Sequence, residues 1–85
     1  MLLADDHEVV RSGLRALLDQ EPDIEVVAEA SDGIGAVELA LSHDVDLAIL
    51  DVSMPKLTGL QATAQLRQHR PDLRILILSV HDNEQ

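Results

Sequence analysis

Acidic residues follow two of the apolar runs in the chain, and these acids have the clearest potential for chemistry. Asp5 and Asp6 come directly after residues 1–4, and Asp51 comes directly after residues 47–50. Carboxylates held close together repel one another and favour a hard divalent cation such as Mg²⁺, which prefers oxygen ligands. With a cation bound, one such carboxylate can attack a phosphoryl group and become an aspartyl phosphate. Phosphoryl transfer to an aspartate is therefore the chemistry that the sequence suggests first.

This chemistry requires the acids to meet in the fold, and the order of the predicted elements allows it. Consecutive apolar residues are typical of strands covered on both faces, and spacings of three and four residues are typical of helices. The predicted strands are residues 1–4, 24–28, 47–50 and 73–78. The predicted helices follow Asp6, Asp32 and Thr58, and Thr58 forms a capping box with Gln61. We expect an α/β fold with a doubly wound, flavodoxin-like parallel sheet of strand order 2-1-3-4, in which strands one and three end side by side.

Length and composition exclude several other classes of protein. The chain has 85 residues, which suit one domain, and it has no cysteine, which excludes disulfides and Cys-ligated metals. It has no aromatic residue for stacking on bases, and its net charge of −10 repels phosphate backbones and acidic membranes. No apolar run approaches the roughly 20 residues needed to span a bilayer. We expect a cytoplasmic protein that contacts neither nucleic acid nor membrane through this chain.

Four motifs stand at the predicted strand ends: LLADDH at 2–7, ASDG at 30–33, LDVSMP at 50–55 followed by Gly59, and LILS at 76–79. Together they resemble the receiver domain of two-component response regulators, and the resemblance covers nearly the whole chain. Within that family, DDH followed by VVRSGL at 9–14 is similar to the subclass with a C-terminal LuxR-type helix-turn-helix.

The resemblance implies a role for each matching residue. Asp51 matches the phosphoacceptor, and Asp5 and Asp6 match the acidic pair that holds Mg²⁺ or Mn²⁺ together with Asp51 and the backbone carbonyl of Ser53. Ser79 matches the switch hydroxyl that hydrogen-bonds the phosphoryl group. Ser53 and His81 occupy positions that influence how fast the acyl phosphate hydrolyses.

The resemblance also implies partners and a mode of action. A histidine kinase would supply the phosphoryl group, and a helix-turn-helix output domain elsewhere in the parent protein would contact DNA. A homodimer is a further expected partner. Such a domain assists its own phosphorylation and dephosphorylation without being a turnover enzyme.

The chain departs from the family pattern at its C-terminal side. The family's fifth strand with its phosphate-contacting Lys is absent, as are the last two helices, so residues 1–85 are expected to be an incomplete receiver domain with strand four as an exposed apolar edge. Lys56 does not match the family Lys and is interpreted as a solvated loop charge. His7, His43, His69 and His81 lack metal-ligand spacing and are expected in surface or capping roles.

Two alternative functions stay open from the sequence. One is an interaction or dimerisation module with a receiver-like fold that takes up no phosphate. The other is a phosphatase of the haloacid-dehalogenase type, which also uses an Asp nucleophile after a parallel strand. Such phosphatases have a second acid two residues later, where this chain has Ser53.

Overall fold

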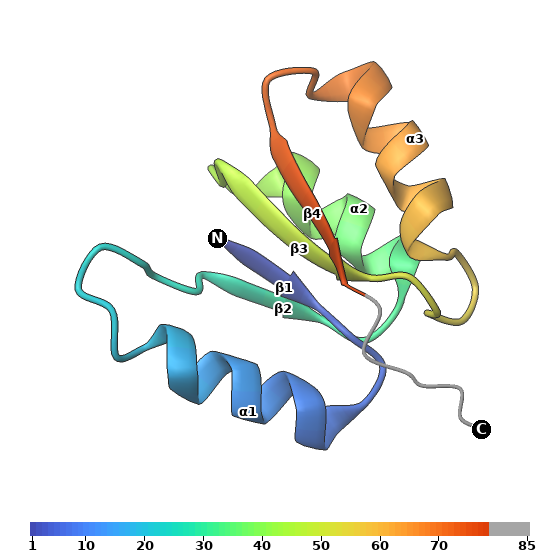
Figure 1. Cartoon of the computed structure of the whole chain (residues 1–85). Coiled ribbons are helices and arrows are strands. Elements are labelled where there is room, and N and C mark those ends of the chain that lie inside the picture. The colour runs from blue at the N-terminus through green and yellow to red at the C-terminus, as the bar shows by residue number, and fades with distance from the viewer. Residues whose placement is uncertain (79–85) are drawn as a thin grey trace.

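Strands and helices alternate along the chain in the computed structural model, which describes residues 1–78 (Figure 1). The strands are β1 (Leu2–Ala4), β2 (Ala28–Ala30), β3 (Leu47–Asp51) and β4 (Arg74–Leu78). The helices are α1 (Glu8–Leu18), α2 (Gly33–Ser42) and α3 (Gly59–His69). The predicted alternation and the predicted capping box at Thr58 are both confirmed, since the Thr58 hydroxyl accepts from the Gln61 backbone N–H and the Gln61 side chain accepts from the Thr58 backbone N–H.

All four strands form one parallel sheet in the predicted order, β2-β1-β3-β4. Helices α2 and α3 cover one face of this sheet, and α1 lies on the other (Figure 1). Ala4 pairs in register with Leu50, so the residues that follow them leave the sheet side by side. The topology is that of a flavodoxin-like fold, and it places the loops after β1 and β3 next to each other at one end of the sheet.

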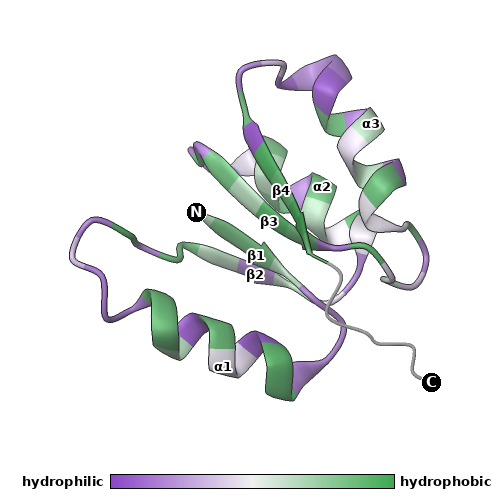
Figure 2. Cartoon of the chain, in the orientation of Figure 1, coloured by the Kyte–Doolittle hydropathy of each residue, from purple (hydrophilic) through white to green (hydrophobic). Residues whose placement is uncertain are grey.

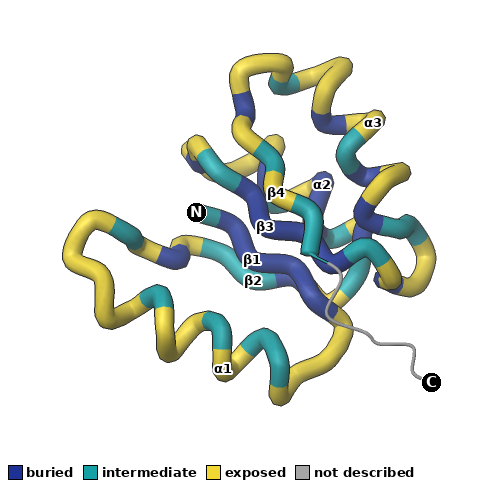
Figure 3. The backbone as a smooth tube through the Cα atoms, viewed as in Figure 1, coloured by how far each residue is buried: buried dark blue, intermediate teal, exposed yellow. Residues whose placement is uncertain are grey.

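The core has two layers of unequal size, one on each face of the sheet. On the side of α2 and α3, thirteen buried side chains form one cluster, with Leu2, Leu50 and Leu66 among the largest. On the side of α1, only Leu3, Val26 and Ile49 are buried, with α1 contributing partly buried Leu14 and Leu18 (Figure 3). None of these side chains is aromatic, since the chain has no aromatic residue.

Helix α1 is less buried than its apolar spacing predicts. Its apolar stripe faces the sheet, but none of its eleven residues is buried, and Leu17 is 63% exposed. The reason is the small number of apolar partners on this face, where the buried cluster holds only three side chains and α1 lies along the β1–β2 side of the sheet (Figures 1 and 2). Apolar spacing predicts which face of a helix turns inward, whereas the depth of burial depends on what covers that face.

Strand β2 begins later than predicted. The predicted strand 24–28 overlaps the observed Ala28–Ala30 only at its last residue. Residues 25–27 are extended beside Met1, whose amino group donates to the Glu25 carbonyl and whose own carbonyl accepts from the Val27 N–H. The regular ladder starts where β1 starts, because Leu2 pairs with Ala28. Pairing with the neighbouring strand, which the local sequence does not reveal, therefore decides the boundary.

Strand β4 forms the sheet edge, as expected from the sequence. Its residues alternate between exposed and partly buried, and Leu76 is 49% exposed (Figure 3). Among residues 1–78, no helix has the length and apolar character needed to cross a membrane.

Candidate metal centre

Three carboxylates meet at the carboxyl ends of the two central strands. Asp51 is the last residue of β3, and Asp5 directly follows β1 at the neighbouring position. Both side chains are almost completely buried, with residue exposures of 2%, whereas Asp6 is exposed. One ligand atom from each of these three residues and from His7 lies within 4.8 Å of all the others. The predicted convergence of the acids is therefore confirmed.

Backbone donors orient two of the three carboxylates. The His7 N–H donates to Asp5 Oδ1 over 2.8 Å, and the Ser53 N–H donates to Asp51 Oδ1 over 3.3 Å. Each donor lies two residues after the acid, so each carboxylate is held by the turn that leaves its own strand. Such short turns follow from the residue types, because Asp side chains readily accept from backbone N–H groups two residues on.

Arg11 fixes the backbone at Asp5, a role that the sequence analysis missed. Its Nη1 donates to the Asp5 carbonyl over 2.6 Å, and its Nε donates to Glu29 of β2 over 3.0 Å. Glu29 also accepts a hydrogen bond from Arg15 of α1. The Asp5 N–H in turn donates to the Ala30 carbonyl over 3.0 Å. Asp5 is thus anchored to β2 directly through its N–H and, by way of Arg11 and Glu29, through its carbonyl.

The Glu29 carboxylate should make this anchor sensitive to acid. The Arg15 guanidinium, which donates to it, holds the pKa of the Glu29 carboxyl below its usual value, and Arg11 acts in the same direction. Because the pKa is lower in the folded state, this group stabilises the fold at pH values above its unfolded pKa of about 4.3, and the contribution is lost as the pH falls through the folded pKa.

We therefore expect the Glu29→Gln variant to unfold at a lower temperature than the wild type at pH 7, and the gap between the two to narrow below about pH 4. Circular dichroism at a series of pH values measures both midpoints. Glu38→Gln, which removes an exposed carboxyl from α2, controls for the change in net charge. A gap that stays constant down to pH 3 would contradict the role given to the Glu29 carboxylate.

The loop after Asp51 passes so close to its surroundings that two positions require glycine. A Cβ built on Gly59 would lie 2.4 Å from the Asp51 carbonyl oxygen, and one built on Gly33 would lie 1.8 Å from the Leu57 carbonyl oxygen. Gly59 opens α3 and Gly33 opens α2, so both helices start against this loop. Gly59, which follows the LDVSMP motif, thus has a steric reason, because its lack of a side chain lets α3 begin directly behind Asp51.

An ion pair also joins this loop to α2. The Lys56 ammonium lies 3.5 Å from Asp32 Oδ2, and Lys56 itself has a left-handed backbone with φ of 69°. Asp32 caps α2 by accepting from the Gly35 N–H over 2.7 Å, and this hydrogen bond, with Lys56, holds the pKa of the Asp32 carboxyl below its usual value. The interpretation of Lys56 as an exposed loop charge is confirmed, with Asp32 as its partner.

The donor set fits a hard divalent cation. Buried carboxylate oxygens are costly without compensating positive charge, and they are the ligands that Mg²⁺ and Mn²⁺ take in proteins. Asp5, Asp6 and Asp51 could hold such an ion, and the Ser53 backbone lies beside Asp51 through its N–H contact.

Two residues with expected roles lie outside the described part of the chain. These are Ser79 and His81, the expected switch hydroxyl and one of the two expected tuning residues. The last described residue, Leu78, pairs in register with Asp51, and its carbonyl accepts from the Val52 N–H over 3.0 Å.

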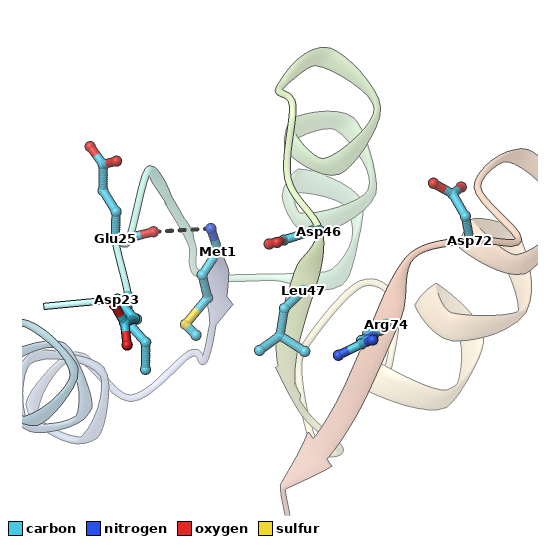
Figure 4. A pocket seen from close by; sticks show the side chains of 8 residues that line it. Met1, Asp23, Glu25, Asp46, Leu47, Asp72 and Arg74 are labelled. Atoms are coloured by element: carbon cyan, nitrogen blue, oxygen red, sulfur yellow. Dashed lines mark hydrogen bonds between the residues drawn. The ribbon is translucent and has the colours of Figure 1, made fainter. Parts of the chain in front are cut away.

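One pocket in the described residues lies away from the acidic cluster. It has a volume of about 390 Å³ and lies at the amino ends of the strands, where Met1, Leu47 and Arg74 line it together with several acids (Figure 4). Leu47 and Asp51 occupy opposite ends of β3. A search by concavity alone would therefore miss the carboxylates that can bind a cation.

Comparisons with known proteins agree with the fold. The transcriptional regulatory protein DegU from Brevibacillus brevis is 43% identical over 84 residues, which make up 99% of this chain and 36% of that protein. The chain therefore spans little more than a third of that curated relative. The receiver domain of the response regulator NarL from Mycobacterium tuberculosis superposes with a TM-score of 0.89 at 38% identity, over 96% of this chain and 66% of the other.

A third relative was solved together with DNA. RcsB from Salmonella enterica serovar Typhimurium, bound to the promoter rprA in the presence of the phosphomimetic BeF₃⁻, has a TM-score of 0.86 at 30% identity, over 96% of this chain and 69% of that one. Neither alternative function considered from the sequence gains support from these matches. The family described as the response regulator receiver domain matches residues 1–85, and this chain belongs to that family.

Proposed function

We propose that this chain is a phosphoacceptor in which Asp51 takes up a phosphoryl group in a reaction that depends on Mg²⁺ or Mn²⁺. The observation that carries the proposal is the convergence of Asp5, Asp6 and Asp51 at one end of the sheet, with Asp51 buried at the centre of the group. Phosphoryl transfer needs a placed nucleophile and compensation of negative charge, and this arrangement supplies the nucleophile and the oxygen ligands that would hold a compensating cation.

In the proposed step, a carboxylate oxygen of Asp51 attacks the phosphorus of the donor. The bond from Asp51 to phosphorus forms as the bond from phosphorus to the donor's leaving group breaks, so the donor leaves with the electron pair of that bond. The Ser53 N–H donates to Asp51 Oδ1 and fixes which way the carboxylate faces. A divalent cation bound by the three acids would stabilise the negative charge on the transferring oxygens.

The remaining residues take roles that follow from family membership. Ser79 would supply the hydroxyl that senses the phosphoryl group, the Ser53 carbonyl would complete the metal ligands, and Ser53 and His81 would tune hydrolysis. A histidine kinase would be the physiological donor, and a helix-turn-helix output domain of the parent protein would bind DNA. The chain would thus act as a stoichiometric acceptor, with no turnover of an external substrate.

The proposal is tested by the intact mass of the chain after incubation with acetyl phosphate. We expect the mass of one added phosphoryl group when Mg²⁺ is present and none when a chelator removes it. A chain that gains no phosphoryl group with either Mg²⁺ or Mn²⁺, at times from seconds to an hour, would overturn the proposal for this chain.

A further inference from the structure

The imidazole of His7 lies inside the acidic cluster. Its Nδ1 is 2.9 Å from Asp6 Oδ1, 3.3 Å from Asp5 Oδ1 and 4.0 Å from Asp51 Oδ2. The surface position expected from the sequence is confirmed, since His7 is exposed, but the expectation did not include its contact with the acids. His7 occupies the N-cap of α1, but its side chain makes no capping hydrogen bond.

These separations match those between ligands of one ion. In an octahedral shell with bonds of about 2.1 Å, adjacent ligand atoms lie about 3 Å apart and opposite ones about 4 Å apart. The distances from His7 Nδ1 to the three carboxylates fall in this range. The two shorter ones are also hydrogen-bond distances, so the nitrogen can donate to these carboxylates without an ion and lie beside them as a fourth ligand with one. The ring is half exposed, with a side-chain exposure of 47%, so it borders the cluster on the solvent side.

Hydrogen bonds also hold the backbone of His7 in place. The His7 N–H donates to Asp5 Oδ1, and the Arg11 N–H donates to the His7 carbonyl over 2.9 Å as α1 begins. The His7 backbone therefore cannot move without breaking the turn that orients Asp5. A ligand positioned in this way loses little conformational freedom when it binds an ion.

We propose that His7 is an additional, nitrogen ligand of the cation held by Asp5, Asp6 and Asp51, and that it makes the site select transition-metal ions over Mg²⁺. This inference rests on the metal site of the proposed function. Carboxylates alone suit Mg²⁺, whereas imidazole is a poor ligand for Mg²⁺, a better one for Mn²⁺ and a good one for Co²⁺ and Zn²⁺. Replacing the imidazole should therefore weaken Mn²⁺ binding far more than Mg²⁺ binding.

The test compares the wild type with His7→Gln and with His43→Gln, a matched variant at the exposed C-cap of α2. Pulsed electron paramagnetic resonance of the Mn²⁺-loaded chain should show hyperfine coupling to a histidine nitrogen in the wild type and in His43→Gln, and none in His7→Gln. Histidine labelled with heavy nitrogen identifies the signal. Calorimetry should give a loss of Mn²⁺ affinity of about tenfold in His7→Gln, with Mg²⁺ affinity changed less than about threefold.

The possible outcomes separate this inference from the proposed function. Mn²⁺ that binds without histidine coupling, yet is lost in Asp51→Asn, overturns the role of His7 and leaves the carboxylate site in place. No Mn²⁺ binding by the wild type overturns both. Far-UV circular dichroism checks that His7→Gln is folded, and if it is not, the labelled wild-type spectrum alone decides.

Discussion

Replacing Asp51 by asparagine is expected to reduce the phosphorylated fraction to less than about one hundredth of the wild-type value, because an amide lacks the nucleophilic carboxylate oxygen. Asparagine has nearly the same shape, and its side-chain oxygen can still accept from the Ser53 N–H. The site should therefore keep its geometry while losing its chemistry. Intact mass after incubation with acetyl phosphate and Mg²⁺ measures the effect.

The same variant is expected to be more stable than the wild type without metal. Removing one of three neighbouring negative charges relieves repulsion in a partly desolvated cluster, by about 1 kcal/mol, which corresponds to roughly 5 °C in the unfolding midpoint. Mg²⁺ should then raise the midpoint less in the variant than in the wild type, because one ligand charge is gone.

Asp46→Asn is the control for Asp51→Asn, since Asp46 is exposed and directly precedes β3 at the far end of that strand. It should take up a phosphoryl group as the wild type does. An equal adduct in Asp51→Asn would show that another residue is the acceptor and would contradict the assignment.

Replacing Gly33 by alanine is expected to lower the unfolding midpoint by roughly 15 °C, or about 3 kcal/mol. The new Cβ would lie 1.8 Å from the Leu57 carbonyl oxygen and 2.6 Å from the Leu57 Cβ. Backbone is on one side of this contact, so a rotamer change cannot relieve it, and either α2 or the loop that follows Asp51 must move. The loop that carries Lys56 and Leu57 can thus pack closely against α2 only because Gly33 has no side chain.

Gly13→Ala is the matched control, and it should change stability in the opposite direction. Gly13 lies inside α1, and a Cβ there would meet nothing within 4 Å. Alanine at such a position favours the helix by up to about 1 kcal/mol, a gain of roughly 5 °C. Thermal unfolding followed by circular dichroism measures both variants. A Gly33→Ala variant as stable as the wild type would show that the loop shifts freely.

The sequence predicts the three carboxylates of the site well, because each of them stands at or just after the end of a strand. Parallel strands bring their carboxyl ends to one edge, so Asp5, Asp6 and Asp51 could be placed together before any coordinates were available. The helix starts at Asp32 and Thr58 were predictable for a similar reason, since side-chain caps depend on neighbours only three residues away.

The features that the sequence did not reveal depend on contacts between distant segments. Arg11 meets Glu29 across 18 positions, and the register of β2 against β1 decides which residue of β2 faces α1. The sequence does contain a sign of the contact between Glu29 and the two arginines. Glu29 is a charged residue between two alanines in a short strand, and Arg11 and Arg15 lie one helical turn apart. The place of His7 beside the carboxylates was not predicted, because the spacing of the histidines does not reveal it: its neighbours in the cluster are carboxylates from two strand ends.

The thin apolar layer beneath α1 affects how long Asp5 and Asp6 stay in the arrangement that the structure shows. Three buried side chains and the guanidinium contacts of Arg11 and Arg15 hold this helix, whereas α2 and α3 rest on a cluster of thirteen. Opening of α1 should therefore require less free energy than global unfolding, and its amides should exchange with solvent hydrogen earlier than those of α2. Salt weakens exposed ion pairs, so the lifetime of the closed α1 should shorten as ionic strength rises. How long Asp5 and Asp6 stay in position is then set locally and depends on salt, separately from the free energy of unfolding of the whole domain.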